Sequence, residues 1–123
     1  MPVRLRPAAR QAVADALSTR TPADDKLLTK HFLAVLAERA PGNSVEVRVP
    51  PYAAAQVIPG VRHTRGTPPA VIETDAATWI ALATGELDWT TAIASGRIIA
   101  SGERTDLTAY LPLTDTNLTM DED

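Results

Sequence analysis

Apolar residues near the start of the chain recur at helical spacing. Four of them fall on one face: Ala9, Val13, Ala16 and Leu17. This predicts a short helix over residues 7–18. Thr21 followed by Pro22 supplies an N-cap and a proline at the first helical position, which predicts a second helix that ends at Pro41. His31 lies beside the apolar stripe of this helix, and we interpret it as a boundary or core histidine.

From residue 44 the hydrophobic period changes to two. Val45, Val47 and Val49 alternate with polar residues, which predicts a strand with one buried and one solvated face, as in antiparallel sheets. Turns rich in proline and glycine separate three further predicted strands: residues 52–58, 61–66 and 70–74.

Two short helices and a last strand follow. Thr74 or Asp75 caps the first helix, Asp88 caps the second, and Gly85 and Gly96 end them with positive φ. The remaining predicted elements are a strand over residues 97–101 and a closing segment over residues 107–113, which is either a short helix or an apolar docking segment.

These elements predict an α+β fold with a five-stranded, mainly antiparallel sheet covered on one face by helices. The 123 residues are too few for two cores, so residues 1–113 are expected to form a single domain. Residues 114–123 are polar and acidic, and we expect them to form a disordered tail.

Composition excludes several classes of protein. The chain has no Cys, which rules out a disulfide scaffold, a thiolate nucleophile and a Cys-based metal site. Its two His, His31 and His63, are far apart, so we expect no metal and no cofactor. The net charge of −3 argues against nucleic-acid binding, although residues 1–66 carry +5 and residues 67–123 carry −8.

The chain also lacks the patterns of membrane insertion and of common catalysis. No apolar run approaches the roughly 18 residues of a membrane span, and no signal peptide is visible. We therefore expect a cytoplasmic protein without stable membrane insertion. The G-x-S-x-G, Gly-rich phosphate-loop and H-E-x-x-H motifs are absent, and we expect no enzymatic activity.

One segment consists of consecutive charged and polar side chains: Arg62, His63, Thr64 and Arg65. Two guanidinium groups and an imidazole within four residues can hold a carboxylate or phosphate head group. The alternative is an exposed edge strand that its charges protect from aggregation.

The second half of the chain carries a characteristic order of elements. A strand leads to an acidic cap, a helix ending in Leu-x-x-Gly, a second helix ending in Gly, and a strand ending in Gly. The matching positions are Asp75, Leu82, Gly85, Ala92, Gly96, Ile98 and Gly102. This pattern resembles the sterol carrier protein family, type two. Residues 62–75 look like the branch of this family found in actinobacteria.

The resemblance implies a five-stranded sheet under helices, with an apolar tunnel between them that holds lipid. It also implies kinship with the C-terminal domain of mycothiol-dependent maleylpyruvate isomerases. Two features depart from the family's animal members. The chain ends in Asp121, Glu122 and Asp123 in place of a peroxisomal tripeptide, and the amphipathic C-terminal helix that helps line the tunnel is shortened.

We therefore expect a non-catalytic domain that binds a lipid or another apolar small molecule. Transfer of this ligand is a second expected role. The expected cavity lies between sheet and helices, where the small residues 53–55 leave room, and basic residues form its rim. The expected ligand-binding residues are Tyr52, Ala54, Val57, Arg62, His63, Arg65, Trp79, Leu82, Trp89 and Ile93. The alternative is that the two tryptophans only fill the core.

Two other functions stay open on the sequence. One is an accessory domain that acts with a thiol-dependent, mycothiol-type enzyme. The other is a protein-interaction module that uses the basic N-terminal half. Both require a protein partner.

Overall fold

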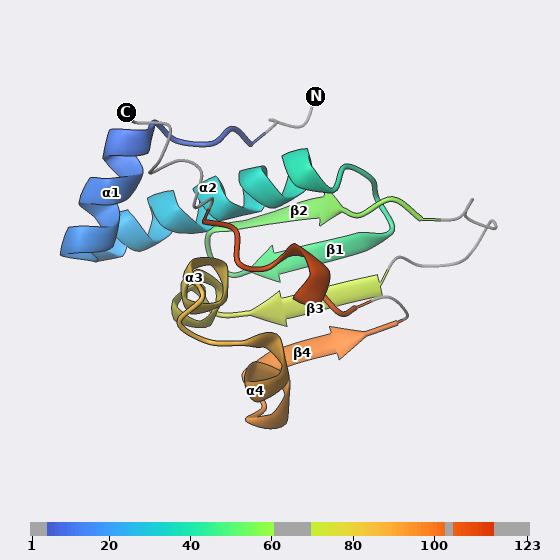
Figure 1. The fold of residues 1–123 in the computed structure, drawn as a ribbon. Coiled ribbons are helices and arrows are strands. Elements are labelled where there is room, and N and C mark those ends of the chain that lie inside the picture. The colour runs from blue at the N-terminus through green and yellow to red at the C-terminus, as the bar shows by residue number, and fades with distance from the viewer. Residues whose placement is uncertain (1–4, 61–69, 103–104, 115–123) are drawn as a thin grey trace.

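The computed structural model describes residues 5–60, 70–102 and 105–114. Its elements in chain order are α1 (Arg10–Thr19), α2 (Pro22–Arg39), β1 (Val45–Val49), β2 (Ala53–Val57), β3 (Ala70–Thr74), α3 (Ala76–Thr84), α4 (Trp89–Ala94), β4 (Ile98–Ser101) and the 3-10 turn η1 (Thr108–Tyr110). Figure 1 shows their arrangement, and the α+β class is confirmed. No helix of the described part is long and apolar enough to cross a membrane.

The described strands form one mixed sheet in the order β2-β1-β3-β4. The outer pairs are antiparallel, whereas the central strands β1 and β3 run parallel, with Val47 beside Ile72. The described part thus holds four of the five expected strands, and two of its three pairings are antiparallel as expected, whereas the central pairing is parallel. Alternation of apolar residues reports which face of a strand is buried, not the direction of its neighbour. The strand expected over residues 61–66 lies outside the described residues.

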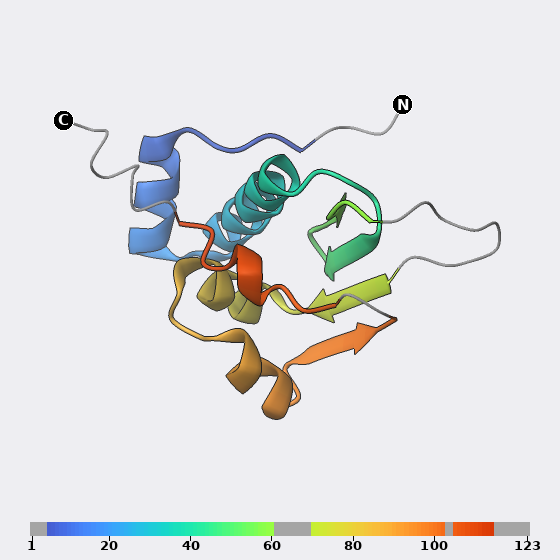
Figure 2. The same cartoon turned by 45° about the vertical axis from the view of Figure 1, so that its right-hand side comes forward.

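The sheet has one covered and one open face. Figures 1 and 2 show the helices gathered on one side of it. Val45, Val47 and Val49 of β1 are fully buried toward the helices, and the register places Ala53, Ala55 and Val57 of β2 beside them. Arg48 and Ala54 are paired on the opposite, exposed face. The face of β1 that the alternation predicts to be buried is thus the face that the whole sheet packs against the helices.

The helices begin and end where local chemistry satisfies their free backbone groups. Thr21, Asp75 and Asp88 cap α2, α3 and α4, and each accepts the backbone N–H three residues further on. Gly85 and Gly96 follow α3 and α4 with φ of 86° and 75°, which confirms the predicted positive φ. A side chain at either position would strain a backbone conformation that glycine adopts freely.

The core between helices is centred on Trp79 of α3. Its ring is fully buried and packs in one cluster with Leu28, Phe32 and Leu36 of α2. The indole Nε1 donates a hydrogen bond to the backbone oxygen of Thr29 at 3.3 Å. Burial of the ring together with this hydrogen bond fixes α3 against α2.

Within the described residues, the hydroxyl groups of Thr29 and Thr78 are buried without a hydrogen-bond partner. We expect Thr29→Val to stabilise the fold by about 1 kcal/mol, since valine keeps the shape and removes an unpaired polar group. The urea midpoint of unfolding measures the change. Thr29→Ser keeps the hydroxyl and loses the methyl group, so it should destabilise. A valine variant that is less stable than the parent would show that the hydroxyl has a partner.

The segment after β4 returns across the helices to the neighbourhood of α1. Leu107 and Leu113 are buried in the core, with 0% and 2% exposure. The backbone N–H groups of Leu113 and Thr114 both donate to the carbonyl of Ala83, at 2.7 and 3.1 Å. Residues 107–113 therefore form the docking segment that the sequence allowed, with η1 as their only helical turn.

Candidate functional site

The residues expected to line a cavity between sheet and helices lie in different surroundings. Four of them are core residues, at most 8% exposed: Val57, Trp79, Leu82 and Trp89. Tyr52 is half-buried in the turn between β1 and β2. The three expected rim residues lie outside the described residues: Arg62, His63 and Arg65. For Trp79, the fully buried ring agrees with the alternative in which the tryptophans fill the core.

Two other expected residues face solvent. Ala54 lies opposite Arg48 on the open face of the sheet, because successive residues of a strand point to opposite sides. Its neighbours Ala53 and Ala55 point toward the helices instead. Ile93 of α4 is 42% exposed. Neither Ala54 nor Ile93 lies in the layer between the sheet and the helices.

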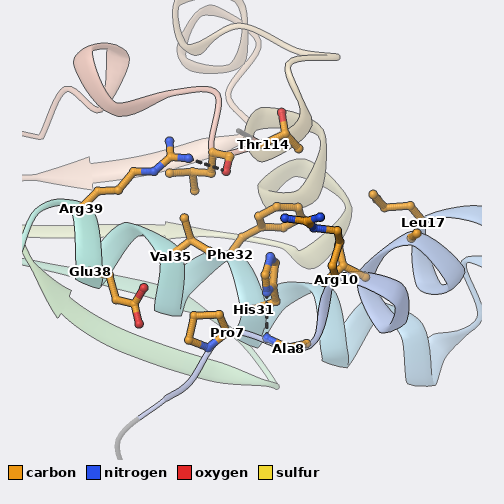
Figure 3. A pocket seen from close by; sticks show the side chains of 13 residues that line it. Pro7, Ala8, Arg10, Leu17, His31, Phe32, Val35, Glu38, Arg39 and Thr114 are labelled. Carbon is orange, nitrogen blue, oxygen red and sulfur yellow. Dashed lines mark hydrogen bonds between the residues drawn. The ribbon is translucent and has the colours of Figure 1, made fainter. Parts of the chain in front are cut away.

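A groove of about 530 Å³ lies elsewhere, between α1, α2 and the segment that contains Leu113 and Thr114 (Figure 3). Its larger apolar lining residues are Val13, Leu17, Phe32, Val35 and Leu113. Its polar lining residues are Arg10, His31, Glu38, Arg39 and Thr114. We call it the α1–α2 groove. Of the ten expected ligand-binding residues, the seven that the structure describes do not contribute to its lining.

The groove exists because α1 is amphipathic but covers little of the core. The apolar stripe of α1 includes Val13, Ala16 and Leu17, yet Ala16 is its only buried residue. Val13 and Leu17 are half-buried and line the groove. On the facing helix, Phe32 belongs to the core while Val35 is half-buried. Apolar surface on both helices is therefore left accessible between them.

His31 joins the groove to the residues that precede α1. Its Nδ1 accepts a hydrogen bond from the backbone N–H of Ala8 at 2.9 Å (Figure 3). Its ring meets that of Phe32 edge-to-face, with ring centroids 4.9 Å apart. Burial without a compensating charge lowers the pKa of His31 below its ordinary value of 6.5. The neutral imidazole is thus the form that this site favours.

Arg39 closes the groove at the end of α2. Its two terminal nitrogens donate to the backbone oxygens of Pro112 and Leu113, at 3.2 and 3.1 Å. These bonds hold the C-terminal segment beside α2, so that Leu113 forms one wall. A guanidinium has five N–H donors, so Arg39 keeps further donors beside the apolar lining.

Several of these residues are prominent in the sequence, but no pattern there joins them into a site. Val13 and Leu17 were placed on the apolar stripe of a helix, and His31 at the boundary of another. The signal that could have identified the groove is the apolar stripe of the short first helix, which contains Val13 and Leu17. Arg39 and Leu113 are 74 residues apart, and no local pattern joins them.

A second, smaller hollow of about 230 Å³ lies at one end of the sheet, beside Glu73, Asp75 and Arg97. Asp75 already accepts the N–H of Thr78 at 2.7 Å as the cap of α3. The presence of the Asp75 carboxylate in this hollow is therefore explained by its role as the cap of α3. Among residues 5–60, 70–102 and 105–114, no three side chains of the metal-ligating types converge.

Comparison with known proteins identifies one family. A family model described as bacterial SCP ortholog, where SCP stands for sterol carrier protein, matches residues 20–113. The match begins just after α1, so it includes α2 and the C-terminal wall of the groove but not α1 itself. A search of curated proteins finds no match. The matched range covers most of the chain, which therefore belongs to the family of bacterial sterol carrier protein orthologues.

Proposed function

We propose that this protein binds a lipid or another apolar small molecule without transforming it, and that the α1–α2 groove is the binding site. The observation that carries the proposal is accessible apolar surface on two facing helices, enclosed by a docked C-terminal segment. Membership of the sterol carrier protein family supports a binding and transfer kind of function.

The size of the groove fits this role. Small-molecule sites commonly measure about 300–1,000 Å³, with apolar walls and a few polar groups. At about 530 Å³ the α1–α2 groove lies inside this range. Each methylene group that leaves water for such a site contributes about 0.8 kcal/mol. A medium-length alkyl chain against Val13, Leu17 and Val35 can therefore supply the main part of the binding energy.

The polar groups of the groove give a ligand its orientation. Arg10 and Arg39 are exposed basic residues of the lining, and Glu38 is an exposed acidic residue of the same lining. The alkyl part of a ligand would lie along the apolar wall, and its polar end would meet Arg39, which has spare N–H donors. In this arrangement the ligand would lie between α1 and α2, and Trp79 and Leu82 would serve as core residues.

The test is a series of straight-chain alcohols of increasing length, measured by titration calorimetry. We expect the affinity to rise about fourfold for each added methylene, which is 0.8 kcal/mol converted at 1.4 kcal/mol per tenfold, until the groove is full. Binding should also carry a negative heat-capacity change, the signature of apolar burial. Affinity that does not change with chain length, or the absence of saturable binding, would contradict the proposal.

A further inference from the structure

The residues before α1 form one edge of the groove. We call residues 5–9 the strap. Leu5 packs against the core, while Pro7 and Ala8 line the groove directly. The backbone N–H of Ala8 donates to Nδ1 of His31 at 2.9 Å, and Figure 3 shows this bond crossing from the strap to α2. The strap is thus tied to α2 by a titratable side chain.

The bond exists in one protonation state only. In neutral imidazole one ring nitrogen carries a proton and the other accepts, so Nδ1 can accept from Ala8 when the proton is on Nε2. In the imidazolium form both nitrogens carry protons, and Nδ1 cannot accept. Protonation therefore replaces an attractive contact by two N–H groups that face each other.

We propose that the contact between His31 and Ala8 is a pH-sensitive latch, which holds the strap over the α1–α2 groove at neutral pH and releases strap and ligand on acidification. This inference rests on the proposed function, because it assigns regulation to the same groove. The strap precedes the range matched by the family model, whereas His31 lies within it.

The direction of the pH effect follows from linkage. The latched state disfavours the imidazolium, and burial lowers the pKa of His31 below 6.5. With the strap released the ring is solvated and its pKa returns toward the ordinary value. The released state therefore binds more protons than the latched state below about pH 6.5, and acidification shifts the equilibrium toward release. Above that pH both states hold a neutral ring, and the latch keeps its full strength.

The charged groups that face the same groove come from both helices. Arg10 projects from α1, and Glu38 and Arg39 project from α2 (Figure 3). The strap contributes Pro7 and Ala8 and no charge to the lining, and the C-terminal segment contributes Leu113 and Thr114. The lowered pKa of His31 follows from burial of its ring rather than from these charges. A Glu38→Gln variant therefore distinguishes an effect of the Glu38 carboxylate from an effect of the His31 imidazole.

Two readouts test the latch at about pH 7.5 and about pH 5, on either side of the ordinary histidine pKa. The first is NMR of the Ala8 amide and the His31 ring, which reports the hydrogen bond without any ligand. The second is stopped-flow release of decanol, an uncharged probe whose own charge does not change with pH. We expect the Ala8 amide to gain backbone mobility at the lower pH, and the release rate to rise at least about tenfold.

Matched variants assign the effect to His31. His31→Asn keeps an oxygen near the position of Nδ1, so it should accept from Ala8 at both pH values and release decanol slowly at both. His31→Leu removes the acceptor and should release decanol fast at both. Glu38→Gln should still release decanol faster at about pH 5 than at about pH 7.5, because it leaves the bond between Ala8 and His31 in place.

The outcomes distinguish this proposal from the proposed function. An Ala8 amide that stays hydrogen-bonded after the imidazole is protonated overturns the latch, whether or not decanol binds. The latch is also overturned if decanol binds and the parent and His31→Asn share one pH profile of release. Loss of the Ala8 bond on acidification, with no decanol binding at either pH, keeps the latch and overturns the binding function of the groove.

Discussion

Replacing Trp79 by alanine is expected to destabilise the fold by about 3–5 kcal/mol, as for other fully buried tryptophans. The ring is fully buried between α2 and α3, and its Nε1 donates to the backbone oxygen of Thr29. Truncation loses the apolar contacts, leaves a cavity and removes a hydrogen bond. Folded domains are stable by only about 5–15 kcal/mol, so the loss is a large share of the total.

Urea unfolding followed by circular dichroism measures this loss. Trp79→Phe is the matched control, because it keeps most of the ring and removes the Nε1 donor, and it should cost clearly less than Trp79→Ala. A cost below about 1 kcal/mol for Trp79→Ala would show that the ring is loosely packed, far from the values of core truncations. That result would restore the cavity between sheet and helices that the sequence suggested.

A charge placed in the apolar wall of the α1–α2 groove is expected to abolish most ligand binding. Val13 is half-buried on α1 and lines the groove. In Val13→Asp a bound alkyl chain would cover an ionised carboxylate, and burial of a polar group without a partner costs about 2 kcal/mol or more. The affinity for decanol should therefore fall at least about thirtyfold.

Ile93→Asp is the control for this substitution. Ile93 is 42% exposed on α4 and does not line the groove, so the same change in charge should leave the affinity within about twofold. Circular dichroism and the urea midpoint show whether each variant is folded. Should Val13→Asp fail to fold, Leu17→Asp tests the same wall one helical turn further along. Equal loss of affinity in Ile93→Asp and the groove variants would contradict the assignment of the site.

Local signals predicted most elements of the fold. The caps Thr21, Asp75 and Asp88 are one-residue features whose hydrogen bonds reach only three residues along the chain, so the sequence contains the whole interaction. The alternation in β1 likewise identified its buried face. The parallel pairing of β1 with β3 was missed, because strand direction depends on chain reversals that a period of two does not encode.

The residues of the candidate site could be predicted from the sequence less well than the elements of the fold. The family resemblance directed attention to Trp79 and Leu82, whose large apolar side chains suit a core and a cavity equally well. What separates the two is exposure, and both are at most 1% exposed. The groove depends instead on half-buried residues such as Val13, and on the contact between Arg39 and Leu113 across 74 positions. Partial burial and long-range hydrogen bonds have no periodic signature in a sequence.

Covalent labelling by an alkyl diazirine, followed by peptide mass spectrometry, tests most directly whether the α1–α2 groove holds the apolar ligand. On illumination the probe inserts into the side chains that surround it, and an excess of decanol should compete with specific labelling. We expect labels within residues 7–17 and 31–39, centred on Val13, Leu17 and Val35. Competed labels confined to residues 52–58 and 79–93 would place the ligand between the sheet and the helices and contradict it.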